Sequence, residues 1–169
     1  MSKKSKNSSG EPEKTNAARL LDKAGIPYKL VPYEVDENDL SATHVADTLG
    51  EDVAMVFKTL VLHGDRTGGG GYFVCVIPGA EEVDLKKAAK AAGMKKAEMI
   101  PMKELLPLTG YIRGGCTAMK KPFPIYFHST ATGFDRIFVS AGQRGLQLEL
   151  SPSDLIGYVK GEVADLIKD

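Results

Sequence analysis

The residue least expected in its surroundings is Lys58, which stands inside the most apolar run of the sequence, residues 53–62. If this run is a β-strand, Lys58 shares a face with Val56 and Leu60, while Thr59 lies on the other face. Both faces are then mostly apolar, which is typical of a strand covered on both sides. Because a lysine is costly to bury without a partner, two interpretations stand. The ammonium either reaches out to water from the strand end, or lines a pocket and holds an anionic or carbonyl-bearing ligand.

A second group of candidate residues lies in the run 110–117, which contains the pair Gly114-Gly115. Paired glycines let a ligand approach the backbone closely, and successive amide N–H groups can stabilise a developing oxyanion. A tight turn or a β-bulge is the structural alternative. The run from Ser140 to Gly145 is a similar loop at the end of a predicted strand, and it has the same two interpretations.

Other site chemistries find little support. The three histidines, His44, His63 and His128, have no cysteines or carboxylates at zinc-ligand spacing, so we expect neither a metal nor a cofactor. The sequence contains no Gly-x-Ser-x-Gly elbow of a serine hydrolase. Cys75 falls in an apolar run, which predicts a buried free thiol.

The composition predicts a single globular domain with an ordinary core: 169 residues, of which 43% are hydrophobic and 26% charged. Because the net charge is zero, contact with nucleic acid requires a local basic patch. Five lysines form such a cluster on and after a predicted helix, and either contact RNA phosphates or make up a solvated helix face. They are Lys86, Lys87, Lys90, Lys95 and Lys96.

Residues 1–14 lack any apolar residue after Met1 and predict a disordered tail, which leaves residues 15–169 as the folded domain. This tail has no apolar core of a secretory signal, and no stretch approaches membrane-spanning length. Two cysteines far apart suit a reducing compartment. We therefore expect a soluble cytoplasmic protein with no membrane partner.

The elements that must position these residues alternate irregularly. Apolar spacing predicts a helix at 17–24, with Leu20 and Leu21 on one stripe and Gly25 as its end. Ser41 and Asp84 are N-cap residues of helices predicted at 42–49 and 85–92. A last helix is predicted from Pro152 onward, and a short helical turn at 105–108. Strands are predicted at 26–31, 53–62, 72–77, 97–100, 124–127, 136–140 and 146–150, the second and third forming a hairpin. Because strands outnumber helices without regular alternation, the fold class is α+β. We expect one compact domain with a mixed, curled, barrel-like sheet and flanking helices.

Four segments of the sequence, in order, resemble the YbaK/EbsC family, which is related to the editing domain of bacterial prolyl-tRNA synthetases. They are residues 56–61 (VFKTLV), 83–90 (VDLKKAAK), 108–116 (LTGYIRGGC) and 139–145 (VSAGQRG). The resemblance runs from about Thr15 to the C-terminus. It implies a deacylase that acts in trans on mischarged aminoacyl-tRNA, typically cysteinyl-tRNA(Pro), with prolyl-tRNA synthetase as a further partner and no DNA partner.

The resemblance also assigns roles. The family's essential lysine matches Lys58, as the catalytic residue. Substrate-binding positions match Tyr33, Thr59, Gly114, Gly115, Ser140 and Gln147. The family is thought to use no protein nucleophile, because the substrate's own thiol attacks its ester carbonyl. Two departures are visible: the loop after Gly115 is shorter than usual, and Gln147 stands where some members have aspartate.

Three hypotheses about function stand. The first is the cysteinyl-tRNA deacylase, in which a small pocket would exclude prolyl esters. The second is an alanyl- or seryl-tRNA deacylase of the same superfamily. The third is a non-catalytic module that binds tRNA or a synthetase. Lys58 favours an enzyme, because a binding module has no need of a lysine inside an apolar strand.

Overall fold

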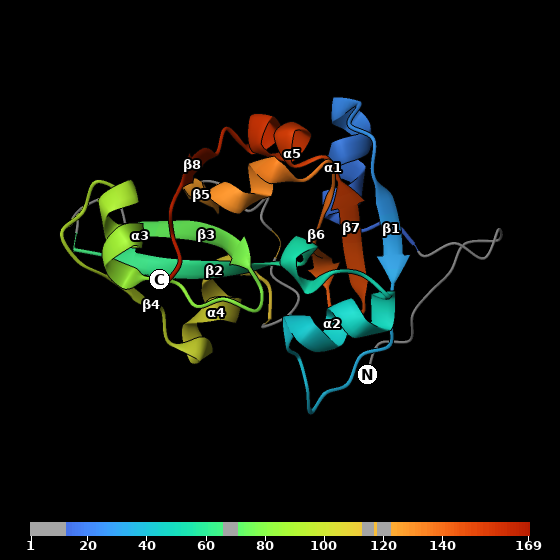
Figure 1. The fold of residues 1–169 in the computed structure, drawn as a ribbon, viewed down its shortest axis with the longest axis horizontal. Helices are drawn as coiled ribbons and strands as arrows, with labels where there is room; N and C mark the ends of the chain where they lie inside the picture. The colour runs from blue at the N-terminus through green and yellow to red at the C-terminus, as the bar shows by residue number, and fades with distance from the viewer. Residues whose placement is uncertain (1–12, 66–70, 113–116, 118–122) are drawn as a thin grey trace.

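The computed structural model describes residues 13–65, 71–112, 117 and 123–169, whose fold is shown in Figure 1. The helices are α1 (Asn16–Ala24), α2 (Ala42–Leu49), α3 (Leu85–Ala91), α4 (Met102–Thr109) and α5 (Pro152–Val159), with short 3-10 turns η1 (Val53–Met55) and η2 (Ser129–Gly133). The strands are β1 (Lys29–Pro32), β2 (Phe57–Gly64), β3 (Tyr72–Pro78), β4 (Ala97–Met99), β5 (Ile125–His128), β6 (Ile137–Gln143), β7 (Leu146–Leu150) and β8 (Glu162–Ala164). Within the described residues, no helix has the length and apolarity needed to cross a membrane.

The strands form two sheets, and the α+β class is confirmed. One sheet has three antiparallel strands in the order β1-β7-β6, and the other has five strands in the order β4-β2-β3-β5-β8. The larger sheet is mixed, because β5 runs parallel to both β3 and β8. The expected mixed sheet is confirmed, but the described strands do not close into a barrel, and they are divided between two sheets. Among the described residues, the only backbone pairing between the two sheets is the bridge between Val56 and Phe138, which lies between η1 and β2.

Three apolar clusters hold these elements together. The largest lies between the sheets under α1 and α5, and it includes Phe57, Val61 and Val74 from the central hairpin. A second cluster on the opposite face of that hairpin packs against α3 and includes Leu62 and Cys75. The hairpin of β2 and β3 is therefore covered on both faces, as its apolar sequence predicts. A third cluster places α2 and η1 against Tyr33 and Phe138.

The predicted helix boundaries largely hold. Gly25 ends α1 with a φ of 73°, and Ser41 begins α2 by accepting a hydrogen bond from the His44 amide. Leu20, predicted on the buried stripe of α1, is instead 43% exposed. The predicted turn at residues 105–108 is a full helix, α4. Strand β8 was not predicted, because its three residues are too few to show an alternating apolar pattern.

The C-terminal residues are fastened beside the turn that follows β3. Leu166 is fully buried, and its carbonyl accepts a hydrogen bond from the Asp84 amide, while the Lys168 amide donates to Glu82. The Leu166 amide donates to Nδ1 of His128, a side chain only 4% exposed, at 3.1 Å. Lys87 completes the attachment, because its ammonium bonds Asp165, Asp169 and the Ile167 carbonyl at 2.8–2.9 Å.

Burial lowers the pKa of His128 below its usual value, and the nearby Asp165 carboxylate only partly offsets this effect. Glu81 acts in the same direction as Asp165, whereas the Lys87 charge lowers the pKa further. The neutral ring is also the form that can accept the Leu166 amide hydrogen through Nδ1. Between the ordinary histidine pKa and the lower pKa of His128 in the folded protein, the unfolded chain binds more protons than the folded one. The free energy of unfolding therefore falls as the pH is lowered through this interval.

We expect the melting temperature of the wild type to fall as the pH is lowered from about 7.5 to about 5.5. His128→Asn keeps an acceptor for the Leu166 amide but does not titrate, so its melting temperature should change less over this interval. Thermal melts of both proteins at matched ionic strength measure the difference. Equal pH dependence in the two proteins would contradict the role given to His128.

Candidate functional site

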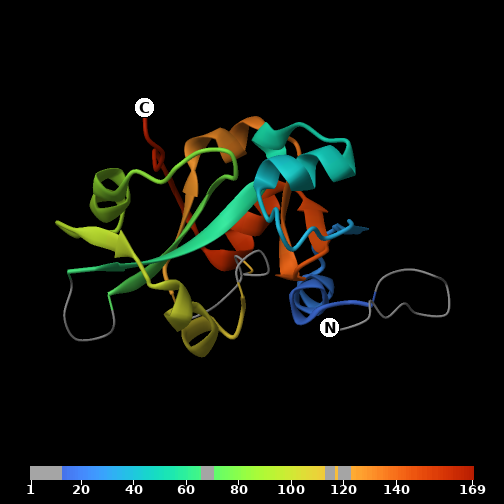
Figure 2. The ribbon, with the colours of Figure 1, turned by 90° about the horizontal axis from the view of Figure 1, so that it is seen from below.

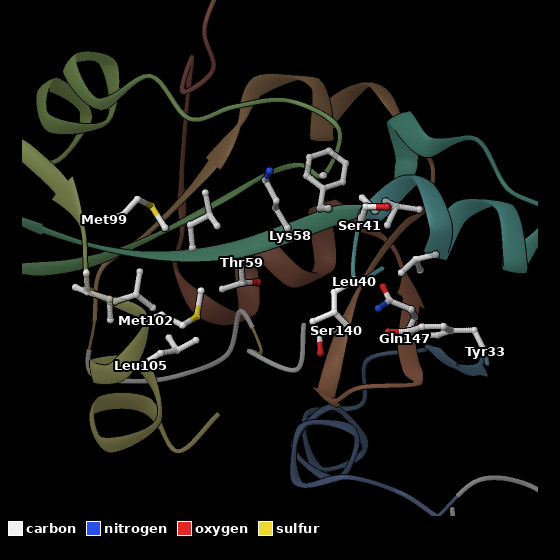
Figure 3. A pocket seen from close by; sticks show the side chains of 18 residues that line it. Tyr33, Leu40, Ser41, Lys58, Thr59, Met99, Met102, Leu105, Ser140 and Gln147 are labelled. Carbon is white, nitrogen blue, oxygen red and sulfur yellow. The ribbon is translucent and has the colours of Figure 1, made fainter. Parts of the chain in front are cut away.

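A pocket of about 520 Å³ runs along β2, between α2 and the three-stranded sheet at one end and α4 at the other (Figure 3). Its wall combines apolar side chains with a few polar ones, as ligand sites commonly do. The lining residues that the argument below uses are Tyr33, Lys58, Thr59, Met99, Met102, Leu105, Ser140 and Gln147.

The pocket exists because one edge of β2 is only partly paired. On its other edge β2 pairs with β3 along seven residue positions, from Phe57 to His63. On the pocket edge, β4 pairs only with residues 62–64, and η1 leaves just the bridge at Val56. The Val61 carbonyl accepts from the Ile100 amide on this edge, so by alternation the backbone N–H and C=O of Thr59 also point away from β3. No described strand pairs with Thr59 there.

Lys58 and Thr59 project to opposite sides of this edge, as the alternation of a strand requires (Figure 3). The half-buried Lys58 lies on the side of the turn after β3, where its charge helps to lower the pKa of Glu82. The main cause of that lowered pKa is Lys168, whose ammonium lies 3.0 Å from the Glu82 carboxylate. The pocket thus reaches a cation on one side of β2 and a hydroxyl on the other.

The polar end of the pocket is built by the three-stranded sheet. Register places Gln147 opposite both Val31 and Ser140, and Tyr33 follows two residues after Val31 on the same face. The Tyr33 amide donates to the Gly145 carbonyl, and the Ser140 hydroxyl accepts from the Gly142 amide, so both are held in place.

Two side-chain oxygens in this pocket have no hydrogen-bond partner among the described residues: Thr59 Oγ1 and Gln147 Oε1. Both are buried atoms, and Gln147 as a whole is 5% exposed. An unsatisfied buried acceptor costs about 1–3 kcal/mol, so such atoms are uncommon in native structures unless a ligand or water completes them. The two oxygens therefore mark positions where a bound molecule with donor groups fits.

The described lining contains no carboxylate, imidazole or thiol, and its ionisable side chains are Lys58 and Tyr33. Cys75 lies elsewhere, buried in the second cluster, and burial raises its pKa to about 12. The described wall thus offers no pairing of a nucleophile with a base. It can hold a substrate, orient it and stabilise negative charge. No group of histidine, cysteine and carboxylate residues in the described chain could hold a metal ion.

The structure brings together five of the residues predicted from the sequence, namely Lys58, Tyr33, Thr59, Ser140 and Gln147. Gly114 and Gly115 lie outside the described residues. Among the predicted RNA-contacting lysines, Lys87 is engaged by the C-terminal segment, whereas Lys86, Lys90, Lys95 and Lys96 are exposed. Sequence reasoning missed the apolar end formed by Met99, Met102 and Leu105. Its only signal was the pair of methionines within and just after a short predicted strand.

Comparison with known proteins places the chain in context. The sequence profile of the aminoacyl-tRNA editing domain family matches residues 36–158, well over half of the chain. A protein of Enterococcus faecalis with the provisional name Cys-tRNA(Pro)/Cys-tRNA(Cys) deacylase EbsC is 46% identical over 156 residues, which cover 91% of this chain and 93% of that protein.

Two crystal structures share the fold. One, of a hypothetical protein, superimposes with a TM-score of 0.79 at 22% identity and covers 89% of this chain and 97% of its own. The other, of a protein described as a candidate trans-editing enzyme for prolyl-tRNA synthetase, has a TM-score of 0.77 at 23% identity and covers 93% and 100% of the two chains.

The wall of the pocket depends on a close approach between Gly79 and α2. A β-carbon added at Gly79 would lie 2.1 Å from the Ala42 β-carbon, an impossible contact, and 3.2 Å from the Val56 carbonyl oxygen. Both Gly79 and Ala42 line the pocket. Because the Ala42 methyl is fixed to the helix backbone, only movement of α2 or of the turn can make room.

Gly79→Ala should therefore lower the free energy of unfolding by about 1–3 kcal/mol, the usual cost of overpacking. It should also weaken ligand binding, because α2 forms one wall. Gly133→Ala is the matched control, since an added β-carbon there meets nothing within 4 Å. Urea denaturation of both variants makes the comparison, and equal stability of the two would contradict the tight contact.

Proposed function

Because the chain belongs to the aminoacyl-tRNA editing domain family, we propose that it is a cytoplasmic deacylase that removes cysteine from mischarged tRNA(Pro). The substrate is proposed from the name given to the Enterococcus relative. The observation that carries the reaction class is the pocket wall. Its described part holds one cation, Lys58, and two buried oxygens without a partner, Thr59 Oγ1 and Gln147 Oε1, and it has no carboxylate, imidazole or thiol that could pair with a nucleophile.

Such a wall suits an ester that carries its own nucleophile. In a cysteinyl ester, the thiol sulfur attacks the ester carbonyl carbon, so that a C–S bond forms and the C–O bond to the ribose breaks. The thiol proton goes to the departing ribose oxygen, which leaves tRNA with a free hydroxyl. Water then opens the resulting thiolactone to release cysteine. The protein contributes orientation and stabilisation of charge on the carbonyl oxygen.

Each residue has a distinct part in this proposal. Lys58 holds ribose, ester or phosphate oxygens through its ammonium, and the amides of Gly114 and Gly115 are assigned to the carbonyl oxygen. Thr59 Oγ1 and Gln147 Oε1 accept hydrogen bonds from substrate hydroxyl or amino groups, which would satisfy both buried oxygens. Tyr33 and Ser140 shape the polar end.

The exposed lysines supply contacts to the RNA backbone. Lys86 and Lys90 lie on α3, and Lys95 and Lys96 follow it on the way into β4. Lys87 takes less part than the sequence predicts, because its ammonium already bonds the C-terminal segment. Prolyl-tRNA synthetase, the enzyme that makes the mischarged product, is a further partner in this proposal.

Lys58→Ala should reduce the single-turnover rate of cysteine release from cysteinyl-tRNA(Pro) by about a hundredfold, the usual loss when one charge-stabilising donor is removed. The fold should survive, since alanine is compatible with a strand covered by apolar groups. Lys58→Arg should restore only part of the rate, because a planar guanidinium does not occupy the space of a compact ammonium.

Lys23→Ala is the matched control, because Lys23 is an exposed lysine on α1 that does not line the pocket. It should react at the wild-type rate. Thermal melts run beside each assay separate a catalytic loss from unfolding. A well-folded Lys58→Ala protein with wild-type rates would remove Lys58 from the mechanism.

The substrate assignment is tested with tRNA(Pro) charged with cysteine, serine, alanine or proline. We expect release of cysteine to be faster than release of alanine or proline by a factor of a hundred or more, because neither ester carries an internal nucleophile. Comparable rates on the alanyl ester would replace the thiol mechanism with one that uses water, and would favour an alanyl-tRNA deacylase. Failure to hydrolyse any of the four esters would indicate a binding module.

A further inference from the structure

The pocket has two chemically different ends. Figure 3 shows Met99, Met102 and Leu105 toward one end, with Met99 on the Lys58 side of β2 and the other two on the Thr59 side, and Tyr33 and Gln147 at the other end. Met99 and Met102 are 41% and 59% exposed, although they are among the larger apolar side chains of the protein. Exposed methionines at a pocket mouth offer a polarisable surface that adapts to the shape of a ligand.

The charges around the two ends also differ. Beside the polar end, the segment from Tyr33 to Ser41 carries four exposed acids: Glu34, Asp36, Glu37 and Asp39. Of these, Glu37 pairs with Arg144 at 2.8 Å. The methionine end, built by β4 and α4, has Lys95, Lys96 and Lys103 beside Glu98 and Glu104. The helix packed beside β4, α3, adds the exposed Lys86 and Lys90. The net charge of zero therefore conceals an acidic end and a basic end.

We infer that this polarity fixes the direction in which the substrate lies, a conclusion that rests on the proposed function. The base of the 3′-terminal nucleoside packs at the methionine end, on Met102 and Leu105, and the aminoacyl group extends toward Ser140 and Gln147. The ribose between them lies at the unpaired edge of β2, where the backbone groups of Thr59 are available. The RNA chain leaves the pocket past β4.

The size of the pocket agrees with this arrangement. A cavity of about 520 Å³ suits a ligand of several linked groups, and a cysteinyl group alone would fill a small part of it. Apolar side chains hold unstacked bases in many nucleic-acid enzymes, where they replace the stacking lost on leaving the helix. The methionine end supplies such a surface, whereas the polar end has the unpartnered Gln147 oxygen suited to an amino or hydroxyl group.

The opposite direction is unfavourable on electrostatic grounds. With the base beside Tyr33, the phosphates would leave past Glu34, Asp36 and Asp39, and like charges at an interface oppose binding. With the base at the methionines, the phosphates pass Lys95 and Lys96, which lie immediately before β4. Release of counterions then favours binding.

Methyl NMR of protein labelled at the methionine methyl groups tests the base position directly, with AMP as the probe. Ring currents of an adenine packed on this surface should shift the Met102 signal most. Met55 is the internal control, because it packs in the cluster that contains Tyr33, at the other end. Shifts confined to Met55, or absent at every methionine at saturating AMP, would overturn the assignment.

Kinetics on cysteinyl-tRNA(Pro) provide the second test. Met102→Ala should raise the enzyme concentration for half-maximal rate about tenfold, the usual effect of losing one stacking contact, while the rate at saturation stays unchanged. Leu106→Ala is the matched control: this leucine is 53% exposed on the same helix but does not line the pocket, so it should behave as the wild type. Equal effects of the two substitutions would overturn the inference.

Charge reversal tests the direction of the RNA. Lys95→Glu combined with Lys96→Glu should weaken binding and flatten its salt dependence, whereas Glu34→Lys combined with Asp36→Lys should change the salt dependence much less. The reverse ranking would indicate the opposite direction. Since all these variants are compared with an active wild type, a failed inference leaves the deacylase intact. A wild type that binds AMP at the methionines but hydrolyses no ester would instead refute the proposed function.

Discussion

The site depends on the unequal pairing of one strand. β2 is paired along nearly its whole length with β3. Among the described strands, its other edge pairs only with β4, at residues 62–64, and the bridge from Val56 to Phe138 of β6 lies just before β2 begins. Backbone groups buried without partners are costly, so an edge of this kind persists where water or a ligand can satisfy it. The gap is maintained by η1, which bends the chain before β2, and by α4, which carries it away after β4. Lys58 and Thr59 lie on β2 itself, and Ser140 and Gln147 face the pocket from the three-stranded sheet. The pocket lies between these two groups of residues.

The turn after β3 links this edge to the C-terminus. Gly79 presses against α2 on the pocket side, while Glu82 and Asp84 are bonded to the C-terminal residues on the other. Lys58 faces the same turn, so the position of its ammonium depends on contacts that are remote in sequence. The Lys87 attachment and the neutral His128 ring therefore support the site without touching it. Lys87, which the sequence predicts as an RNA contact, thus has a structural role as well, because its ammonium bonds the C-terminal residues.

Much of the fold follows from local signals. The caps at Ser41 and Asp84 and the left-handed glycine at Gly25 were predicted because capping needs few neighbours. Lys58 was identified because a cation inside an apolar run conflicts with its surroundings. The division into two sheets was not predictable, since it depends on η1 and on which strand edge β6 approaches. Nor was the methionine end, because Met99 and Met102 are apolar residues whose exposure is decided by tertiary packing. The orientation of the Lys87 side chain was not predictable either, because the Ile167 carbonyl that it bonds lies 80 residues further along the chain.

The absence of a base in the described wall bears on specificity. The sequence suggested exclusion of proline by size, yet a cavity of about 520 Å³ that also admits a nucleoside is a weak sieve for a side chain differing by a few atoms. A wall that supplies charge and orientation but no nucleophile discriminates in another way. In the proposed mechanism it favours esters that can attack their own carbonyl, so a correctly charged prolyl ester would survive even when it enters. Adding a carboxylate or imidazole to the wall would raise hydrolysis of every ester alike. In this proposal, the selectivity of editing depends on the lack of a general base in the pocket. The buried Gln147, a neutral side chain at the polar end, agrees with it.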